Sequence, residues 1–489
     1  MLTLLIGRDW KANRREILRR ISEDVHQRRP GRILVVPELI SHDTERRLCA
    51  AAGDTASRYA EVLSFTRLAR RVTDSVGSAA LECLDNGGRV VAMAAAARAL
   101  SGRLKAYASV ETKPEFLTGL IDAVDEFKRC CITSETLLNA SRALEGGFAQ
   151  KLEELALLME SYDALCSRGK RDPRDQMTWC LEQLEDSDYA QKHVFYIDGF
   201  PDFTRQHLSV LEHLIRESPS VTVSLNCDSV GSRLMAFEKA GDTAKQLLDC
   251  ARRSGVEYEV RLIEEREEPL AQVRGRLFQG HINPGFARDC LTCYRAENPY
   301  MEVMEAAEAV LGLVRGGCRY RDINLVCTDM SVYAPLVNQI FHRFEIPLYQ
   351  SGTEDILQKN VVSTVLCALD AALSGFEQRS VLRYLRSGLS PLSLDACDRV
   401  ENYAIIWGIR GSKWTKDWEN HPEGLSAQWN DAYRAQLQQI NQDREKAIGP
   451  LKRLRDAITA GSDLRGQVLA LYDFLQEIRL EKRLSSLAR

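Results

Sequence analysis

The chain has 489 residues, of which 45% are hydrophobic and 27% are charged, and its formal net charge is -4. This length exceeds what one ordinary core supports, so we expect two to four globular domains. The sequence contains no run of about 18 apolar residues, and the opening Met1–Gly7 is too short for the apolar part of a signal peptide. It therefore predicts a cytoplasmic protein without a membrane segment, in which the fourteen cysteines are reduced and mostly buried.

Positive charge is concentrated at the N-terminus. Residues 1–72 contain 15 Lys and Arg against 9 Asp and Glu, a net of +6, so the rest of the chain carries -10. A basic segment on an acidic chain is a pattern that favours phosphate binding. The alternative is a set of solvated helix faces with no ligand.

The first elements follow the order of a parallel α/β sheet. Residues 2–6 predict a buried strand, 14–28 an amphipathic helix, 32–37 a second strand and 61–65 a third, with a helix beginning at residues 67–72. Strands that alternate with helices in this way pair in parallel, because each helix carries the chain back to the starting edge of the sheet.

A helical region then interrupts this pattern. Residues 77–190 are rich in Ala, Leu and Glu, after which strands return at 193–198, 220–225 and, as an edge strand, 256–262. We therefore expect residues 1–76 and 191–296 to form one α/β domain, with 77–190 inserted in it as a helical domain.

A second, shorter α/β pattern follows. Residues 306–315 and 332–343 predict helices, 323–327 and 346–349 predict short strands, and the chain is helical from about residue 361 onward. The boundaries expected are 297–372 for the start of a second sheet domain and 373–489 for a truncated second helical insert. Two RecA-like parallel-sheet domains, each with a helical insert, are the layout of superfamily-one helicases, a fold-level analogy that does not establish activity.

The loop after the first strand stands where a phosphate-binding GxxxxGK[ST] motif belongs. Gly7 matches, but Ala12, Asn13 and Arg14 replace the second glycine, the lysine and the hydroxyl residue. Lys11 lies two positions too early to replace the missing lysine. We therefore expect no nucleotide hydrolysis here, whereas an ATP-driven translocase with a variant loop is the competing hypothesis.

Asp198, at the end of the strand 193–198, occupies the place of the magnesium-binding carboxylate in such folds. A working helicase follows it with Glu, but Gly199 follows here, so a turn or helix cap formed by Asp198 is the simpler interpretation. The sequence thus predicts a degenerate nucleotide site without catalytic residues, made of Gly7, Lys11, Asn13, Arg14 and Asp198.

A second candidate site begins at the third strand. In Leu63–Val72 an aromatic residue and several arginines meet at a strand-to-helix junction, where a helix N-terminus binds phosphate. Phe65 would stack on a base, and Arg67 would contact a base edge or the backbone. A buried Phe65 with surface arginines explains the same pattern.

Cys290 and Cys293 have the CxxC spacing of metal ligands. A structural metal site needs two further ligands, for which Cys318, Cys327 and His281 are the candidates, but no second CxxC is present. We therefore expect no metal site in this chain.

Several motifs together resemble the AddB (RexB) family, the B subunits of bacterial AddAB-type ATP-dependent helicase–nucleases. They are Val36-Pro-Glu38, Ser64-Phe-Thr-Arg-Leu-Ala69, Tyr196-Ile-Asp-Gly-Phe-Pro-Asp-Phe-Thr204, Ile346-Pro-Leu-Tyr349 and Glu401-Asn-Tyr-Ala-Ile-Ile-Trp-Gly-Ile-Arg-Gly411 with Trp414. The resemblance spans essentially the whole chain. It implies an inactive helicase-like half, with the nuclease domain, its iron–sulfur cluster and its magnesium lying beyond residue 489.

The resemblance also implies a role in surveying the 3′-ended single strand for the Chi sequence. By position, Phe65 and Arg67 match that recognition patch, and Ser41 keeps a hydroxyl where threonine is usual. Leu39 replaces a base-contacting glutamine and Arg70 a stacking tryptophan, so the sequence leaves open which Chi sequence would be recognised and whether one is recognised at all. Phe200 and Phe203 are additional stacking candidates.

We therefore expect a non-catalytic part of an enzyme complex for double-strand-break resection in recombinational repair. It would bind the 3′-ended single strand and dock an AddA-type helicase–nuclease subunit. A protein-interaction scaffold without DNA contact, acting through the acidic helical inserts, remains the alternative.

Overall fold

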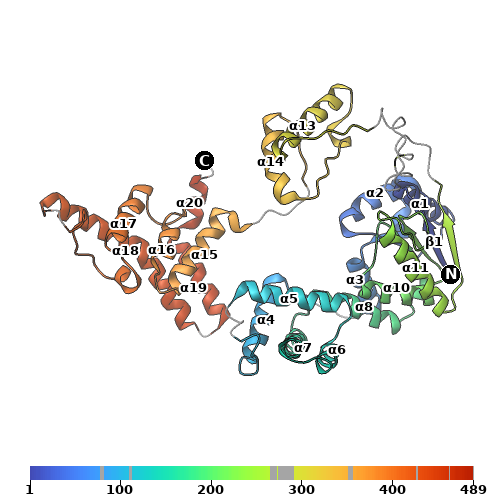
Figure 1. Cartoon of the computed structure of the whole chain (residues 1–489), viewed down its shortest axis with the longest axis horizontal. Coiled ribbons are helices and arrows are strands. Elements are labelled where there is room, and N and C mark those ends of the chain that lie inside the picture. The colour runs from blue at the N-terminus through green and yellow to red at the C-terminus, as the bar shows by residue number, and fades with distance from the viewer. Residues whose placement is uncertain are drawn as a thin grey trace. The chain divides into compact units, whose positions relative to one another are not determined.

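A computed structural model describes residues 1–77, 82–108, 113–264, 273, 291–350, 356–425, 428–461 and 463–487. The chain divides into two compact units, Met1–Tyr294 and Arg295–Arg489. Figure 1 shows the sheet near the N-terminus and the helices that follow it. None of the helices in the described part is long and apolar enough to cross a membrane.

A six-stranded parallel sheet forms the core of the first unit and confirms the predicted α/β class. Its order is β3-β2-β4-β5-β1-β6, so the chain crosses over between non-neighbouring strands. Parallel registers such as Leu2↔Val221 and Leu34↔Tyr196 bring the ends of all strands to common edges. The strands are β1 (Leu2–Ile6), β2 (Arg32–Val35), β3 (Ala60–Leu63), β4 (Val194–Ile197), β5 (Val221–Leu225) and β6 (Tyr258–Leu262).

Helices cover both faces of this sheet, which explains why strands such as β1 and β4 are almost entirely apolar. Alternate residues of each strand point to opposite faces: Phe195 and Ile197 belong to one core cluster, and Tyr196 belongs to another. One face is covered by α1 (Trp10–His26) and α2 (Ser41–Ala52). The other is covered by α3 (Phe65–Val76), α8 (Gln176–Glu185), α10 (Arg205–Glu217) and α11 (Glu238–Arg253).

The helical insert has a core of its own, built around the buried Tyr162 and Met93. Its elements are α4 (Asn86–Ala99), α5 (Pro114–Arg129), α6 (Ser134–Arg142), α7 (Gly147–Cys166) and the 3-10 turn η4 (Pro173–Asp175). Helix α8 lies within the segment 77–190, yet its buried side chains belong to the sheet core. The predicted domain boundaries themselves stay predictions.

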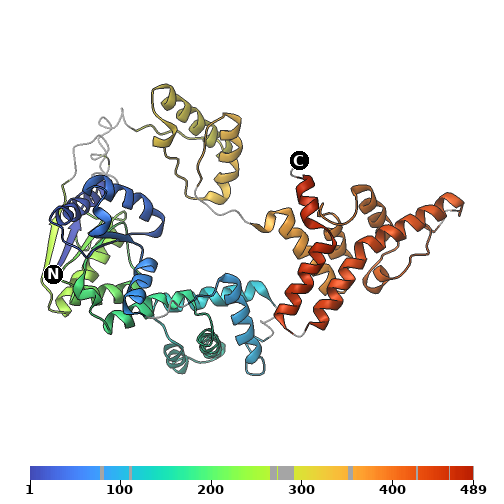
Figure 2. The ribbon, with the colours of Figure 1, turned by 180° about the vertical axis from the view of Figure 1, so that it is seen from behind.

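Helices are the only regular elements among the described residues of the second unit. Helices α13 (Pro299–Arg315) and α14 (Met330–Arg343) pack around Val303, Ile340 and Phe341. A larger core contains the fully buried Trp414, and the long α18 packs along α19 there (Figure 2). The helices around it are α15 (Asn360–Leu373), α16 (Gln378–Leu385), α17 (Leu394–Ile406), α18 (Asp431–Ala460), α19 (Leu464–Glu477) and α20 (Leu480–Leu487).

The strands predicted at 323–327 and 346–349 are wrong: both segments are irregular, and the described residues hold a single sheet. A strand exists only when its backbone pairs with a neighbour, and a short apolar pattern does not reveal whether a neighbour is available. Here the side chains of Val326 and Tyr349 are 87% and 92% exposed, so no second sheet buries them.

Candidate functional site

The loops that follow β1, β4 and β5 meet at the carboxyl edge of the sheet, where open α/β sheets bind their ligands. Gly7 and Asp198 come directly after β1 and β4, whereas Ser224 lies within β5. This edge therefore brings together residues that are as far as 217 positions apart in the sequence, from Gly7 to Ser224.

The loop after β1 is closed by a side chain rather than open to a phosphate. The amide of Asn13 donates hydrogen bonds to the carbonyl oxygens of Gly7 at 3.3 Å and Leu225 at 3.1 Å. A Cβ added to Gly7 would lie 2.5 Å from the Asn13 side-chain oxygen. Asn13 thus fills the concave side of the loop, which a phosphate-binding loop leaves open for the ligand.

A buried ion pair occupies the place where magnesium would bind. The Arg14 Nε donates to Asp198 Oδ2 at 2.5 Å, and the two side chains are only 8% and 5% exposed. The hydroxyl of Ser224 donates to the other carboxylate oxygen. The ring of Trp10 lies over the guanidinium, 5.1 Å from its Cζ. Both oxygens of Asp198 therefore already have partners from the chain itself.

Gly199 stands where a helicase carries its water-activating glutamate, and both its backbone conformation and its close neighbours disfavour any larger side chain there. Its φ is +86°, which favours glycine, and a Cβ there would lie 3.0 Å from Ile40 Cδ1 and 3.2 Å from Arg14 Nη2. Lys11 is exposed, and its ammonium lies 5.8 Å from the Trp10 ring centroid. The residues present therefore do not fit a magnesium nucleotide.

The aromatic residues of the second candidate site form one cluster beside this edge. Phe65 is 5% exposed, with its ring centroid 5.3 Å from that of Phe200 and 6.2 Å from that of Phe203. His207 stacks on Phe65 at 4.2 Å and an interplanar angle of 19°. Phe65 is thus a core residue in this structure, and its stacking on a base stays a prediction, whereas Phe200 and Phe203 are half-buried at the rim.

The sequence analysis missed His207. Burial lowers the pKa of its imidazole to about 4, so the ring is neutral at pH 7 and packs as an aromatic. Thr204 caps α10 by accepting from the His207 N–H at 3.2 Å, which places the ring in the first turn, facing α3. A capping threonine three residues earlier is the only local signal in the sequence, and it does not reveal the contact with Phe65.

Arg67 and Arg70 lie on the exposed side of α3 and line a groove of about 390 Å³ between α2, β3 and α3. Within the described ranges neither guanidinium has a carboxylate partner, whereas Arg71, one residue further on, pairs with Glu61. The backbone N–H of Arg67 donates to the capping hydroxyl of Ser64 at 3.2 Å. Glu45, Glu61 and Asp74 line the same groove, so the charge of its lining is mixed, with Arg67 and Arg70 as guanidinium groups that lack a carboxylate partner among the described residues.

Ser41 lies at the start of α2, and its hydroxyl points inward. It is 7% exposed, and its Oγ donates to the carbonyl oxygen of Glu38 at 2.8 Å. Its contact with DNA stays a prediction. To donate to DNA, the Ser41 hydroxyl would have to give up its hydrogen bond to the Glu38 carbonyl oxygen. The neighbouring Leu39 is 91% exposed and presents an apolar side chain at the same surface.

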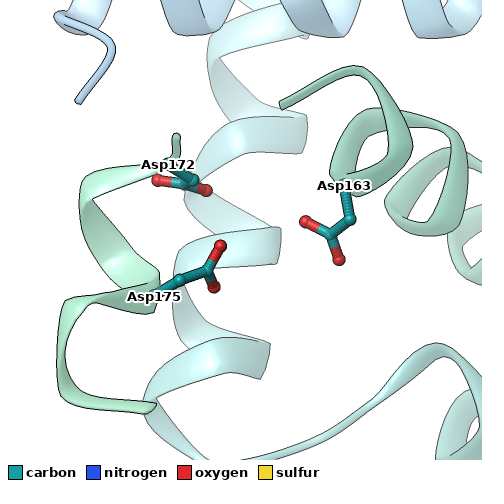
Figure 3. Close-up of side chains that lie close together, drawn as sticks. All are labelled: Asp163, Asp172 and Asp175. Atoms are coloured by element: carbon teal, nitrogen blue, oxygen red, sulfur yellow. The ribbon is translucent and has the colours of Figure 1, made fainter. Parts of the chain in front are cut away.

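Three carboxylates in the insert have the spacing of a metal site, but a lysine already binds them. Asp163 of α7 and Asp172 and Asp175 beside and within η4 turn toward one another (Figure 3). The Lys128 Nζ lies 2.8 Å from Asp163, 3.0 Å from Asp172 and 2.8 Å from Asp175. Burial would lower the pKa of Lys128, but the three carboxylates outweigh it and raise this pKa above its ordinary value. The cluster is an ion-pair network.

The cysteine hypothesis falls partly outside the described residues, which include neither Cys290 nor His281. Cys293 and Cys318 are exposed, and Cys327 Sγ lies 3.1 Å from Met330 Sδ. Among the described residues, none of these three cysteines belongs to a cluster of side chains with the spacing of metal ligands.

Comparison with known proteins agrees with this architecture. The sequence model of the family described as "ADDB, N-terminal" matches residues 4–274. The B subunit of the ATP-dependent helicase/deoxyribonuclease of Geobacillus kaustophilus is 27% identical over all of the chain and 45% of its own length. The corresponding B subunits from Thermoanaerobacter sp. (strain X514) and Clostridium botulinum (strain Langeland) are 28% and 26% identical over 94% and 96% of the chain.

The chain covers 45%, 41% and 42% of the length of these three relatives. The family match extends over more than half of the chain and contains five of the six strands whole, together with the end of β1 and the edge at which Arg14 pairs with Asp198. The chain belongs to the AddB family.

Proposed function

We propose that this chain is a non-catalytic, DNA-contacting part of an ATP-dependent helicase–nuclease that resects double-strand breaks. The observation that carries the proposal is the groove beside α3, where Arg67 and Arg70 lie exposed and, among the described residues, have no carboxylate partner. A guanidinium binds phosphate through parallel hydrogen bonds, and two of them on one helix face fit a nucleic-acid backbone.

Apolar side chains in the loops at the carboxyl edge of the sheet support binding of a single strand. Phe200 and Phe203 are half-buried aromatics at the same edge of the sheet, and Leu39 adds an exposed apolar side chain. Unpaired bases have accessible faces that stack on aromatics, whereas a duplex hides them. The 3′-ended strand is the proposed ligand, and Chi recognition by these side chains is part of the same proposal.

The collapsed nucleotide site supports a non-catalytic role. Arg14 pairs with the carboxylate that would hold magnesium, Asn13 fills the loop that would hold phosphate, and Gly199 stands in place of the glutamate that would activate water. Translocation along DNA would then depend on the motor of an A subunit to which this chain docks. Co-purification with the cognate A subunit tests the docking, and separate elution of the two folded proteins would contradict it.

The first experiment measures fluorescence anisotropy of a labelled single-stranded oligonucleotide at several salt concentrations. We expect binding that weakens steeply with salt, because bound phosphates release counterions. Arg67→Ala should weaken binding and lower the slope of log K against log [salt] by about 1. Arg19→Ala is the matched control, because this exposed arginine on α1 pairs with Glu16.

An oligonucleotide that stays unbound by the folded chain, or an equal loss of affinity in the Arg19→Ala control, would contradict the proposal. Equal retention of binding in Arg67→Ala and Arg70→Ala would place the DNA elsewhere on the protein. ATP turnover with and without DNA is measured in parallel, and we expect none.

A further inference from the structure

Arg14 does more than obstruct a nucleotide. Its guanidinium is a positive charge buried beside Asp198, at the place where nucleotide-hydrolysing relatives of this fold hold a metal ion. A carboxylate in so dry a place needs a permanent counter-ion, since an isolated buried charge is strongly unfavourable. Here the counter-ion is part of the chain and is always present.

The ion pair also packs against backbone that is next in sequence to two of the candidate DNA-binding residues, Phe200 and Ser41. The backbone of Gly199 rests on it: a Cβ added there would lie 3.2 Å from Arg14 Nη2, 3.2 Å from Pro37 Cδ and 3.0 Å from Ile40 Cδ1. Arg14, Gly199 and the segment 37–40 therefore pack as one layer.

This layer is continuous in sequence with the residues that face the proposed ligand. Gly199 is followed by Phe200, which packs edge-on against Phe65. Ile40 is flanked by the exposed Leu39 and by Ser41, which begins α2. The group at the position of the Arg14 side chain therefore determines where the backbone of residues 37–41 and 199–200 lies.

We propose that Arg14 is an internal counter-ion that positions Phe200 and residues 37–41 for DNA without a nucleotide. In a nucleotide-hydrolysing protein of this fold, the bound metal ion would occupy this place. In this chain the support is permanent, so the DNA-facing edge holds one arrangement throughout any nucleotide cycle of a partner. The positioning half of the inference rests on the proposed function, whereas the counter-ion half does not.

The counter-ion half is tested by a thermal double-mutant cycle on the full chain, with Arg14→Met, Asp198→Asn and the double variant. Each single change leaves one buried group without its partner. We expect the Tm at which the unit Met1–Tyr294 unfolds to fall by roughly 10 °C. The double variant buries no charge, so its loss should be clearly smaller than the sum of the single losses. Additive losses would overturn the counter-ion assignment.

A ligand titration gives a second readout of the same half. Magnesium and ATP added to the wild-type chain should leave its Tm unchanged, because only a ligand that binds the folded state raises it. A rise in Tm with increasing nucleotide would show an open site and would overturn the inference even if the cycle were non-additive.

The positioning half is read from single-stranded DNA binding as a function of salt. Arg14→Met should weaken binding roughly threefold to thirtyfold and leave the salt slope unchanged. The contacting variant Arg67→Ala should lower that slope by about 1. The double variant with Asp198→Asn should recover part of the lost affinity. Such a recovery would show that the loss in Arg14→Met comes from the unpaired carboxylate and not from general misfolding.

The outcomes separate the two proposals. Unchanged affinity in Arg14→Met with a lowered Tm would reduce the pair to a stabilising contact, and a lowered salt slope would make Arg14 a DNA contact, so either overturns the positioning role. Absence of DNA binding by the wild-type chain would refute the proposed function, while the thermal cycle would still decide the counter-ion role.

Discussion

At the residue scale, His207 shows how burial sets the charge of a side chain beside a candidate binding surface. Its ring stacks on Phe65 with centroids 4.2 Å apart, and burial lowers its pKa to about 4. A charged imidazole would lose hydration that this contact does not replace, so the folded protein favours the neutral ring. The stability that the aromatic cluster contributes therefore depends on pH through one titratable side chain, His207.

This linkage predicts a measurable loss of stability in acid. The unfolded chain binds a proton at His207 near pH 6.5 and the folded chain only near 4, so the contribution is present above 6.5 and lost as pH falls to 4. The loss amounts to at most about 3 kcal/mol. Urea unfolding at pH 7, 5.5 and 4.5 gives the free energy of unfolding of wild type and of His207→Phe. The contribution of His207 is the difference between the two proteins in how steeply this free energy falls with pH.

The exposed His42 on α2 supplies the control, and His42→Phe should keep the wild-type pH dependence. A parallel fall of stability in wild type and His207→Phe over this range would contradict the prediction, since it would assign the acid sensitivity to other groups.

At the element scale, the sequence predicts what local pattern determines. Strand β1 was predictable as a mostly apolar run because every one of its residues is buried. Helix α1 begins at Trp10, four residues before the predicted start, because Asp9 caps it from within the loop that takes the place of a phosphate-binding motif. The runs at 323–327 and 346–349 have the same apolar pattern but no pairing partner, which the pattern does not encode.

In the candidate site, too, the sequence predicts the local features but not the contacts between distant residues. The loss of the lysine and hydroxyl at positions 13 and 14 is visible in the sequence, and so is the acidic end of β4. The pairing of Arg14 with Asp198 joins residues 184 positions apart and depends on the strand order. A buried Phe65 was one of the two interpretations of the sequence, but its contact with His207 was not predictable, because it depends on how α10 packs against α3.

The insert offers an element-scale prediction, because Lys128 joins α5 to Asp163 of α7 and to Asp172 and Asp175 at η4. Lys128→Met leaves three carboxylates together without this cation and should cost about 3–5 kcal/mol. Guanidinium chloride unfolding measures the loss. Because the carboxylates then repel one another, part of the loss should be recovered by millimolar calcium or by lowering the pH from 7 to 5.

Lys192→Met is the matched control, because its ammonium pairs with Asp188 on the surface and should contribute less than about 1 kcal/mol. Equal losses in the two variants would show that the network in the insert contributes no more than a surface pair.

At the scale of the whole molecule, the two compact units have separate cores. Phe195 is fully buried in the sheet core of the first unit, and Trp414 is fully buried among helices of the second. A chain built in this way need not unfold in a single step, because each core loses its own buried surface cooperatively. Stability is then a property of each unit and not of the chain.

Differential scanning calorimetry tests this independence. Truncating a fully buried aromatic side chain to alanine costs about 3–5 kcal/mol, which lowers the Tm of a unit of this size by roughly 10 °C. We expect Phe195→Ala to lower one transition and Trp414→Ala to lower the other, with additive effects in the double variant. A single transition that both substitutions shift together would show that the units unfold as one, and the thermal cycle on Arg14 and Asp198 would then report on the whole chain instead of on the sheet domain.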